Sequence, residues 1–368
     1  MTGPTALLVG GTGPTGPHMV AELERAGHRI TLLHTGGHEL AQVGHVEHLH
    51  ADVKSGRAVL DALGQRRFDV AIVTYGRLRE IAEVLVGRVG QFVSVGGAPA
   101  YRGYFDPDRW NPAGLPVPTA EDAVASGEDD DGKSYRIRRT EQMVFEHHPD
   151  ATHFRYPYVY GPRQPVPREW YFVRRLLDGR RRIIVPDGGL TLNSQGYAEN
   201  LAHGVVLAVG HPAAAGQVFN LGDREVLTLA QSAELCAAAL DRPLELVSLP
   251  WSVAECARPL VGQHRPTHRL LDVTKAVHLL GYDDVVPARV AVGRTAQWLA
   301  DHPPAPGGVE ERVLEDPFDY AAEDRLLAWW DGAVRTFVDP YAARSTRPGL
   351  GLHYGGPGAS YRRPDTRI

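Results

Sequence analysis

The chain has 368 residues, which suits one large α/β domain or a large domain with a smaller one. With 43% hydrophobic residues, 23% charged residues and a net charge of −5, the composition excludes intrinsic disorder and does not suggest a basic, nucleic-acid-coating protein. The two cysteines, Cys236 and Cys256, exclude a disulfide scaffold and favour a reducing compartment, so we expect a cytoplasmic protein. No apolar run is long enough to span a bilayer and no signal peptide is expected, so no membrane partner is predicted.

Short apolar segments alternate with helical periodicity up to residue 95. Short apolar strands alternating with helices indicate a parallel sheet covered on both faces. This order is typical of the first half of a doubly wound, Rossmann-type α/β fold. The predicted strands are 6–9, 29–33, 46–49, 70–73 and 92–95, and the predicted helices are 19–26, 56–63 and 78–85.

After residue 95 the chain changes character. Residues 96–133 are rich in Gly, Pro, Asp and Tyr, which predicts a long irregular loop with a functional role or disorder. Its acidic run 128–131 is interpreted as a solvated loop tip rather than a metal site. Further helices are predicted at 134–147, 168–177, 197–209 and 229–240, and further strands at 152–156 and 217–220.

The predicted organisation has three parts. Residues 1–160, with parts of 195–222, form the Rossmann domain. Residues 161–195 and 223–305 form a smaller substrate-binding domain. Residues 306–368 are a C-terminal extension with an amphipathic stretch at 321–337, and we expect its tail to be poorly ordered or to lie on a partner subunit, as in a homodimer.

A glycine-rich loop follows the first strand directly and opens the first helix. Glycines at three-residue spacing allow a tight turn, a close approach of the backbone to a pyrophosphate and close helix packing. The helix N-terminus then offers free N–H groups to the phosphates. The sequence therefore predicts a dinucleotide-binding loop made of Gly10, Thr12, Gly13, Pro14, Thr15 and Gly16.

Over residues 5–300 the chain resembles the extended short-chain dehydrogenase/reductase superfamily, which holds NAD(P)-dependent nucleotide-sugar epimerases and dehydratases. The resemblance rests on the glycine loop and on five further segments that occur in the family's order. These segments are A-D (51–52), S-Y-R-I-R-R (134–139), R-Y-P-Y-V-Y-G-P (155–162), G-Y-A-E-N-L-A (196–202) and F-N-L-G (219–222).

The resemblance implies an NAD or NADP cofactor. It places Asp52 near the adenine, and we expect further cofactor contacts from Val53, Tyr75 and Tyr158. At the end of the second strand His34 stands where an acid would bind the ribose hydroxyls of NAD. Because His34 and Thr35 can donate hydrogen bonds to a 2′-phosphate, NADP is slightly favoured over NAD.

The resemblance also implies a catalytic tyrosine with a lysine four residues later and a Ser or Thr ahead of the helix. Tyr135 fits the first position, and Arg139 takes the place of the lysine, keeping the charge without relaying a proton. The hydroxyl position falls on Gly97, and Ser94 is not an obvious substitute because strand alternation points it elsewhere. Either the substrate or a tyrosine such as Tyr101 or Tyr158 supplies the missing contact, or catalysis has been lost.

Arginines gather in the region expected to hold the substrate. They favour an anionic substrate, with a solvated helix face as the alternative reading. We expect Arg168 and Asn193 to contact the substrate, together with Gly97 and Tyr101. The arginines are Arg163, Arg168, Arg174, Arg175, Arg180, Arg181 and Arg182.

No metal site is expected. His45, His48 and His50 are close in sequence, but on a strand His45 and His48 face opposite ways, and no H-E-x-x-H or C-x-x-C motif occurs.

Two functions remain open at this stage. The first is an NAD(P)-dependent oxidoreductase or epimerase/dehydratase-like enzyme that transfers hydride to or from a polar, anionic, nucleotide-sugar-like small molecule. The second is a catalytically degenerate dinucleotide-binding protein that acts as a sensor or assembly partner. Neither function includes a nucleic-acid partner.

Overall fold

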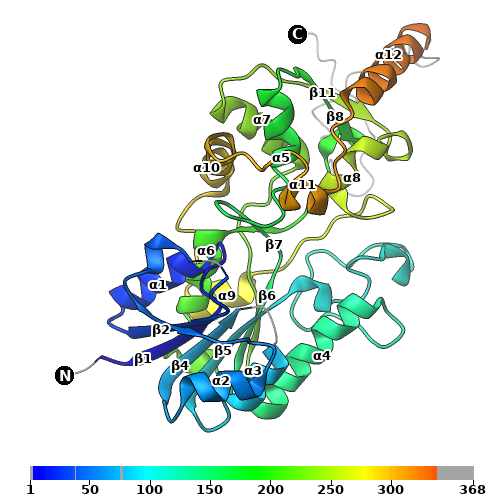
Figure 1. Ribbon diagram of the computed structural model, residues 1–368. Helices are drawn as coiled ribbons and strands as arrows, with labels where there is room; N and C mark the ends of the chain where they lie inside the picture. The colour runs from blue at the N-terminus through cyan, green and yellow to red at the C-terminus, as the bar shows by residue number, and fades with distance from the viewer. Residues whose placement is uncertain (1–2, 38, 75–77, 338–368) are drawn as a thin grey trace, which may run out of the picture. The chain divides into compact units, whose positions relative to one another are not determined.

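The computed structural model describes residues 3–37, 39–74 and 78–337 (Figure 1). The chain forms two compact units, Met1–Pro317 and Phe318–Ile368. The second unit contains α12 (Tyr320–Thr336), at the position of the predicted amphipathic stretch. Among the described residues, no helix is both long and apolar enough to cross a membrane.

The first unit extends beyond the predicted boundary at residue 305. The short helix α11 (Val309–Leu314) contacts α5 (Trp170–Leu177) through Glu311, which accepts a hydrogen bond of 3.0 Å from Trp170 Nε1. Two residues after α11, Asp316 forms a buried ion pair with Arg175 of α5. Because of these buried polar contacts, residues 306–317 belong to the first unit.

A seven-stranded parallel sheet lies at the centre of the first unit and confirms the predicted fold class (Figure 1). Its order is β10-β6-β5-β4-β1-β2-β3, so the chain winds outward in both directions from the junction of β1 and β4. The strands are β1 (Thr5–Val9), β2 (Arg29–His34), β3 (Glu47–His50), β4 (Phe68–Thr74), β5 (Val89–Gly97), β6 (Thr152–Tyr156) and β10 (Val218–Asn220).

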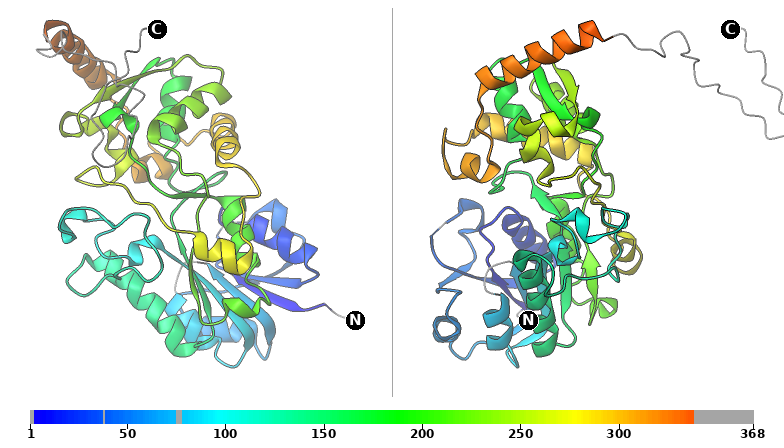
Figure 2. Two further views of the ribbon diagram at one scale, coloured as in Figure 1. Left: turned by 180° about the vertical axis from the view of Figure 1, so that it is seen from behind. Right: turned by 90° about the vertical axis from the view of Figure 1, so that its right-hand side faces the viewer.

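Helices cover both faces of this sheet (Figures 1 and 2). Because strand side chains alternate, Leu8 packs in one core cluster and Leu7 packs in the other. The first cluster is covered by α1 (Gly16–Arg25), α6 (Ala198–Val206) and α9 (Thr274–Leu280). The second cluster is covered by α2 (Gly56–Leu63), α3 (Leu78–Val84) and α4 (Gly132–His147).

The remaining part of the first unit combines two small parallel sheets with helices. These strands were not predicted, because each has only three to five residues and lacks a clear period. The pairs are β7 (Tyr158–Tyr160) with β9 (Gln195–Tyr197) and β8 (Arg182–Pro186) with β11 (Glu245–Leu249). The helices are α5, α7 (Leu229–Ala239), α8 (Arg258–Val261), α10 (Ala288–Asp301) and α11.

The segment between β5 and α4 is irregular, as predicted, but it is held in place. Its described backbone contains only 3₁₀ turns and isolated bridges, and Thr119 exchanges backbone hydrogen bonds with Leu270 (2.7 Å) and Asp272 (2.9 Å). Part of the acidic run has a structural role, because the Asp131 side chain caps α4 by accepting from the amides of Lys133 and Ser134.

A buried ion pair joins α4 to β6. Arg155 donates from Nε to Glu141 Oε2 (2.9 Å) and from Nη2 to Glu141 Oε1 (2.8 Å), and both side chains are almost fully buried. Burial alone would raise the pKa of Glu141, but the Arg155 hydrogen bonds and the nearby positive charges lower it. The pair therefore connects the helix and the strand with well-defined geometry.

We predict that Glu141→Gln lowers the free energy of unfolding by about 3–5 kcal/mol, because it leaves the Arg155 guanidinium buried without its counter-charge. Asp61→Asn is the matched control, since Asp61 pairs with Arg57 on the surface of α2 and should change stability by about 0.5 kcal/mol or less. Urea denaturation of both variants measures the difference. Equal small effects would show that the buried pair is unimportant for stability.

Candidate cofactor and substrate site

The glycine loop between β1 and α1 has backbone geometry that side chains would disturb. Gly10 and Gly11 have φ of +102° and +79°, in the region that favours glycine. A Cβ atom on Gly16 would lie 2.0 Å from the carbonyl oxygen of Gly11, so the start of α1 packs directly on the loop backbone. These are the constraints predicted for a dinucleotide loop.

The middle of the same loop is open. Gly13 is exposed, and a Cβ atom placed on it would meet no atom within 4 Å. Thr12 and Pro14 are partly buried on either side, and the buried Thr15 is the N-cap residue of α1. The loop thus leaves open space at the N-terminus of α1, where the helix dipole favours a negative charge such as the pyrophosphate of a dinucleotide.

The residues predicted at the adenosine end lie around the ends of β2 and β3. His34 is buried, with Nδ1 accepting from the Gly36 amide (3.2 Å) and Nε2 lying 2.9 Å from His48 Nδ1. Thr35 and Asp52 are exposed and Val53 is partly buried. Since His34 has both ring nitrogens engaged, it does not offer a free donor to a 2′-phosphate in this arrangement. The predicted contact Tyr75 lies outside the described residues.

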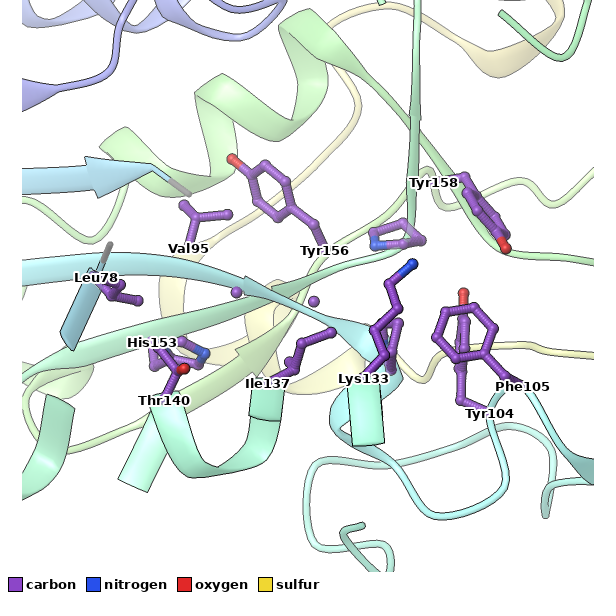
Figure 3. A pocket seen from close by; sticks show the side chains of 14 residues that line it. Leu78, Val95, Tyr104, Phe105, Lys133, Ile137, Thr140, His153, Tyr156 and Tyr158 are labelled. Carbon is purple, nitrogen blue, oxygen red and sulfur yellow. The ribbon is translucent and has the colours of Figure 1, made fainter. Parts of the chain in front are cut away.

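A cavity of about 400 Å³ opens at the carboxyl ends of β5 and β6 (Figure 3). In a doubly wound fold this edge of the sheet is where ligands bind. The cavity is lined by Leu78, Val95, Gly96, Gly97, Pro99, Tyr104, Phe105, Lys133, Ile137, Thr140, His153, Tyr156, Pro157 and Tyr158.

The structure does not bring Tyr135 and Arg139 to this cavity. The α4 residues that line it are Lys133, Ile137 and Thr140, which share one helix face, and residues two positions away point elsewhere. Tyr135 donates a hydrogen bond from its hydroxyl to Glu128 Oε1 (2.9 Å), which raises the pKa of the phenol. Arg139 donates to Gln142 on its own helix (2.8 Å).

Gly97 lines the cavity, and the space beside its neighbour Gly96 is filled by His153. A Cβ atom on Gly96 would lie 2.6 Å from His153 Nε2, and His153 Nδ1 lies 2.7 Å from Ser94 Oγ. Burial lowers the pKa of His153 to about 4, so the imidazole is neutral at physiological pH. The sequence showed no pattern that marked His153.

Tyr101 does not line the cavity. Its ring lies against the Arg155 guanidinium, 4.5 Å from the ring centre, and its hydroxyl donates to Asn220 Oδ1 (2.7 Å). Burial raises the pKa of Tyr101 to about 12. This tyrosine therefore joins the irregular segment to β6 and β10 and does not contact the cavity.

Tyr158 and the predicted substrate residues Arg168 and Asn193 form one polar cluster with Arg269. The Arg168 guanidinium lies 3.2 Å from the centre of the Tyr158 ring. Arg269 donates to the Tyr158 hydroxyl (3.5 Å) and to Asn193 Oδ1 (3.0 Å). Arg269 was missed because it lies 76 residues beyond Asn193, and the bridge between the two residues is a tertiary contact.

This polar cluster carries positive charge that the described residues do not neutralise. No ion pair involves Arg168 or Arg269 in the described part of the chain, and Arg168 Nη1 and Asn193 Nδ2 are buried without a hydrogen-bond partner there. Burial would raise the pKa of Tyr158, but the two guanidinium groups outweigh it and lower the pKa to about 8. Unpaired buried donors of this kind are uncommon in folded proteins, and a bound ligand would satisfy them.

Other arginines of the predicted group have structural partners. Arg174 bonds to Glu311 and Asp178, Arg175 bonds to Asp316, and Arg182 bonds to Glu245 (3.1 Å). Of the predicted group, Arg168 is the arginine that contacts Tyr158, a residue that lines the cavity.

No family model matches the chain. The sequence is 26% identical over 293 residues to chloroplast stem-loop binding protein of 41 kDa b from Arabidopsis thaliana, covering 75% of this chain and 74% of that protein. It is 30% identical over 165 residues to the uncharacterized protein y4nL of Sinorhizobium fredii, covering 39% of this chain and 46% of that protein.

Solved structures of epimerases and dehydratases share the fold. UDP-glucose 4-epimerase from Thermotoga maritima, with UDP-glucose, matches with a TM-score of 0.64 at 17% identity, covering 81% of this chain and 99% of that one. dTDP-glucose 4,6-dehydratase from Bacillus anthracis, in complex with NAD, matches with a TM-score of 0.63 at 14% identity, covering 82% and 97%. The predicted resemblance to the extended short-chain dehydrogenase/reductase fold is confirmed at the level of the fold.

We predict that Gly13→Ala leaves the melting temperature unchanged but weakens binding of NADH or NADPH at least about tenfold, because its methyl group enters the space for the pyrophosphate. Gly16→Ala should instead destabilise the loop itself, since its methyl group collides with the Gly11 carbonyl. Calorimetric titration and thermal unfolding separate the two effects. Unchanged dinucleotide binding by Gly13→Ala would contradict this placement of the cofactor.

Proposed function

We propose that the chain is an NAD(P)-dependent enzyme of the epimerase/dehydratase kind that acts on an anionic small molecule. The observation that carries this proposal is the polar cluster of Tyr158, Arg168, Asn193 and Arg269, in which Tyr158 lines the cavity and the other three side chains lie behind it. The cluster combines a phenol of lowered pKa with the buried Arg269 and the partly buried Arg168, neither of which forms an ion pair among the described residues. An electropositive, partly dehydrated site of this kind suits a phosphate or carboxylate.

The cluster also supports a substrate of the nucleotide-sugar type. The unpartnered Nη1 of Arg168 and Nδ2 of Asn193 are donors, and they match the oxygen atoms of a phosphate or of sugar hydroxyl groups. Lys133 adds a third positive group, since it lines the cavity and its Nζ lies 4.8 Å from the centre of the Phe105 ring. In Figure 3 Lys133 extends from α4 toward the side of the cavity where Tyr158 lies.

Tyr158 is the residue that we propose as acid and base. With a pKa of about 8 the phenol is partly ionised near neutral pH, so it can accept a proton from a substrate hydroxyl and return it. Arg168 and Arg269 stabilise the phenolate and orient the ring. A bound nicotinamide would exchange hydride with the substrate carbon. Tyr135 and Arg139 are not proposed for this step, because their side chains do not line the cavity.

A second candidate function is dinucleotide binding without redox turnover. It is favoured by α4, which presents Lys133 and Ile137 to the cavity, so that this helix supplies neither a tyrosine nor a lysine four residues later. The Arabidopsis relative is by its name a stem-loop binding protein, so an RNA stem-loop belongs among the ligands tested for this candidate, although the net charge of −5 does not suggest RNA binding.

The choice of NADP over NAD, a homodimer and a cytoplasmic location stay predictions. The solved structures that share the fold include complexes with NAD, and the Arabidopsis relative is described as chloroplastic.

We predict that Tyr158→Phe lowers turnover about 10²- to 10⁴-fold, as expected for loss of a general acid/base, while dinucleotide affinity is retained. Tyr135→Phe is the matched control and should keep full activity. The assay follows the absorbance of reduced nicotinamide with a panel of nucleotide sugars, and calorimetry measures dinucleotide binding. Loss of turnover in Tyr135→Phe instead would contradict the role of Tyr158. Tight dinucleotide binding with no turnover on any substrate would favour the second candidate.

The pH dependence gives an independent measurement. In the oxidative direction the rate should rise with pH through about 8, because the base form of Tyr158 is the phenolate. Arg168→Gln removes a charge that stabilises the phenolate, so the midpoint of this rise in rate should move up by about one pH unit or more. Tyrosinate absorbance should show the same titration without substrate, and Tyr158→Phe should remove it. An unchanged midpoint in Arg168→Gln would contradict the interpretation that the guanidinium groups lower the pKa of Tyr158.

A further inference from the structure

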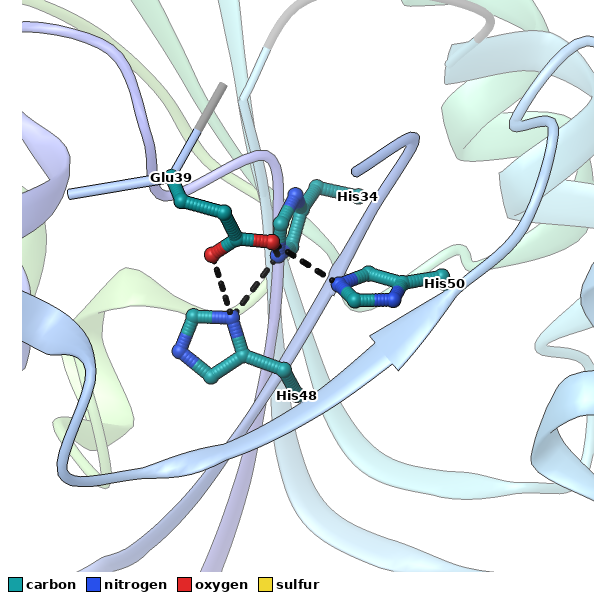
Figure 4. Close-up of side chains that lie close together, drawn as sticks. All are labelled: His34, Glu39, His48 and His50. Carbon is teal, nitrogen blue, oxygen red and sulfur yellow. Dashed lines mark hydrogen bonds and ion pairs between the residues drawn. The ribbon is translucent and has the colours of Figure 1, made fainter. Parts of the chain in front are cut away.

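Three histidines and a glutamate meet at the edge of the sheet formed by β2 and β3 (Figure 4). His34 ends β2, His48 and His50 lie on β3, and Glu39 lies in the connection between the two strands. We refer to these four residues as the histidine cluster. Their ligand atoms all lie within 4.8 Å of one another.

The parallel register creates this cluster. His34 pairs with His50 across the two strands, and His48, two residues earlier, faces the same side of the sheet. The sequence reading grouped His45 with His48 and His50, but His45 precedes β3 and lies 2.7 Å from Glu24. In the folded chain His34 and Glu39, and not His45, lie beside His48 and His50. The spacing of histidines along the sequence could not reveal this grouping, because it depends on strand pairing.

The distances within the cluster are close to those between the ligands of a four-coordinate ion, and the contacts to Glu39 involve both of its carboxylate oxygens. Zn²⁺ binds histidine nitrogen and carboxylate oxygen at about 2.0–2.2 Å, so neighbouring ligand atoms of a tetrahedral site lie roughly 3.3–3.6 Å apart. His48 Nδ1 lies 3.3 Å from Glu39 Oε2, and His50 Nε2 lies 3.0 Å from Glu39 Oε1. His34 Nε2 lies 2.9 Å from His48 Nδ1 and 3.8 Å from Glu39 Oε1.

The hydrogen bonds around the cluster orient two of the rings. His48 donates from Nε2 to the carbonyl oxygen of Val43 (2.9 Å), which leaves Nδ1 as its unprotonated nitrogen, the form that a metal requires. His34 Nδ1 accepts a hydrogen bond from the Gly36 amide (3.2 Å). A cation bound at Nε2 would require the proton of the neutral ring to sit on Nδ1, so the Gly36 amide would have to turn away from that nitrogen. Gly36 is a glycine with φ of +78°, in a region where the backbone can adjust.

We propose that the histidine cluster is a site for a divalent transition-metal ion, with Zn²⁺ as the cation that best fits three imidazoles and one carboxylate. His34 and His48 are largely buried and hold the inner side, while His50 and Glu39 are 54% exposed and give the ion a path from solvent. The ion would tie the connection between β2 and β3 to the ends of both strands.

The test uses full-length protein without a histidine tag, from which metal has been removed. Calorimetry and metal analysis with Zn²⁺ should show one site per chain, and Co²⁺ should give the intense visible absorption of a four-coordinate ion. Zn²⁺ should also raise the melting temperature, because it binds the folded chain. Glu39→Gln and His50→Ala change half-exposed side chains, so both variants should fold, and each should weaken Zn²⁺ binding at least about tenfold.

His45→Ala is the matched control, a nearby exposed histidine outside the cluster, and should bind Zn²⁺ as the wild type does. The proposal is overturned if the wild type binds no Zn²⁺, or if the double variant Glu39→Gln/His50→Ala binds it as tightly as the wild type. It is also overturned if Co²⁺ gives only the weak absorption of a six-coordinate ion.

Discussion

The contact between Arg155 and Glu141 determines which face of α4 looks into the cavity. Glu141 must point at β6 to meet the buried guanidinium, and residues four and eight positions earlier on a helix share its face. Those residues are Ile137 and Lys133, and both line the cavity. The same rotation carries Tyr135 and Arg139 away from it. One buried ion pair thus determines which side chains of α4, the longest described helix of the first unit, face the cavity.

The prediction at α4 illustrates the limit of motif spacing. Tyr135 and Arg139 satisfy a four-residue spacing, but spacing states only that two side chains share a face and does not say which face is turned inward. Ile137 and Val144, seven residues apart, were the available signal, because apolar residues at this interval mark a buried face. The helix is too polar for this signal to stand out, and its inward face is instead specified by a charge, whose partner Arg155 lies on another element.

The strands, helices and glycine loop of the sheet could be predicted because they depend on local periodicity and backbone geometry. Several of the segments on which the family resemblance rests contain buried residues that hydrogen-bond separate elements of the fold to one another. Tyr160 donates to Asp223 (2.6 Å), as does Asn200 (2.9 Å), and Asn220 accepts from Tyr101. Such residues indicate the architecture reliably, because an unsatisfied buried polar group is costly. They say little about the reaction, because their role is to hold the fold together.

The sites themselves depend on contacts between distant elements, which sequence reasoning cannot supply. The polar cluster joins residues 111 positions apart, and the histidine cluster arises only from strand register. Both sites lie at carboxyl ends of strands, the histidine cluster at β2 and β3 and the cavity at β5 and β6, on either side of the loop that follows β1. The direction of winding reverses between β1 and β4. A ligand held by the glycine loop after β1 would therefore have the histidine cluster on one side and the cavity on the other. The sheet topology therefore relates the two sites, although no motif connects them in the sequence.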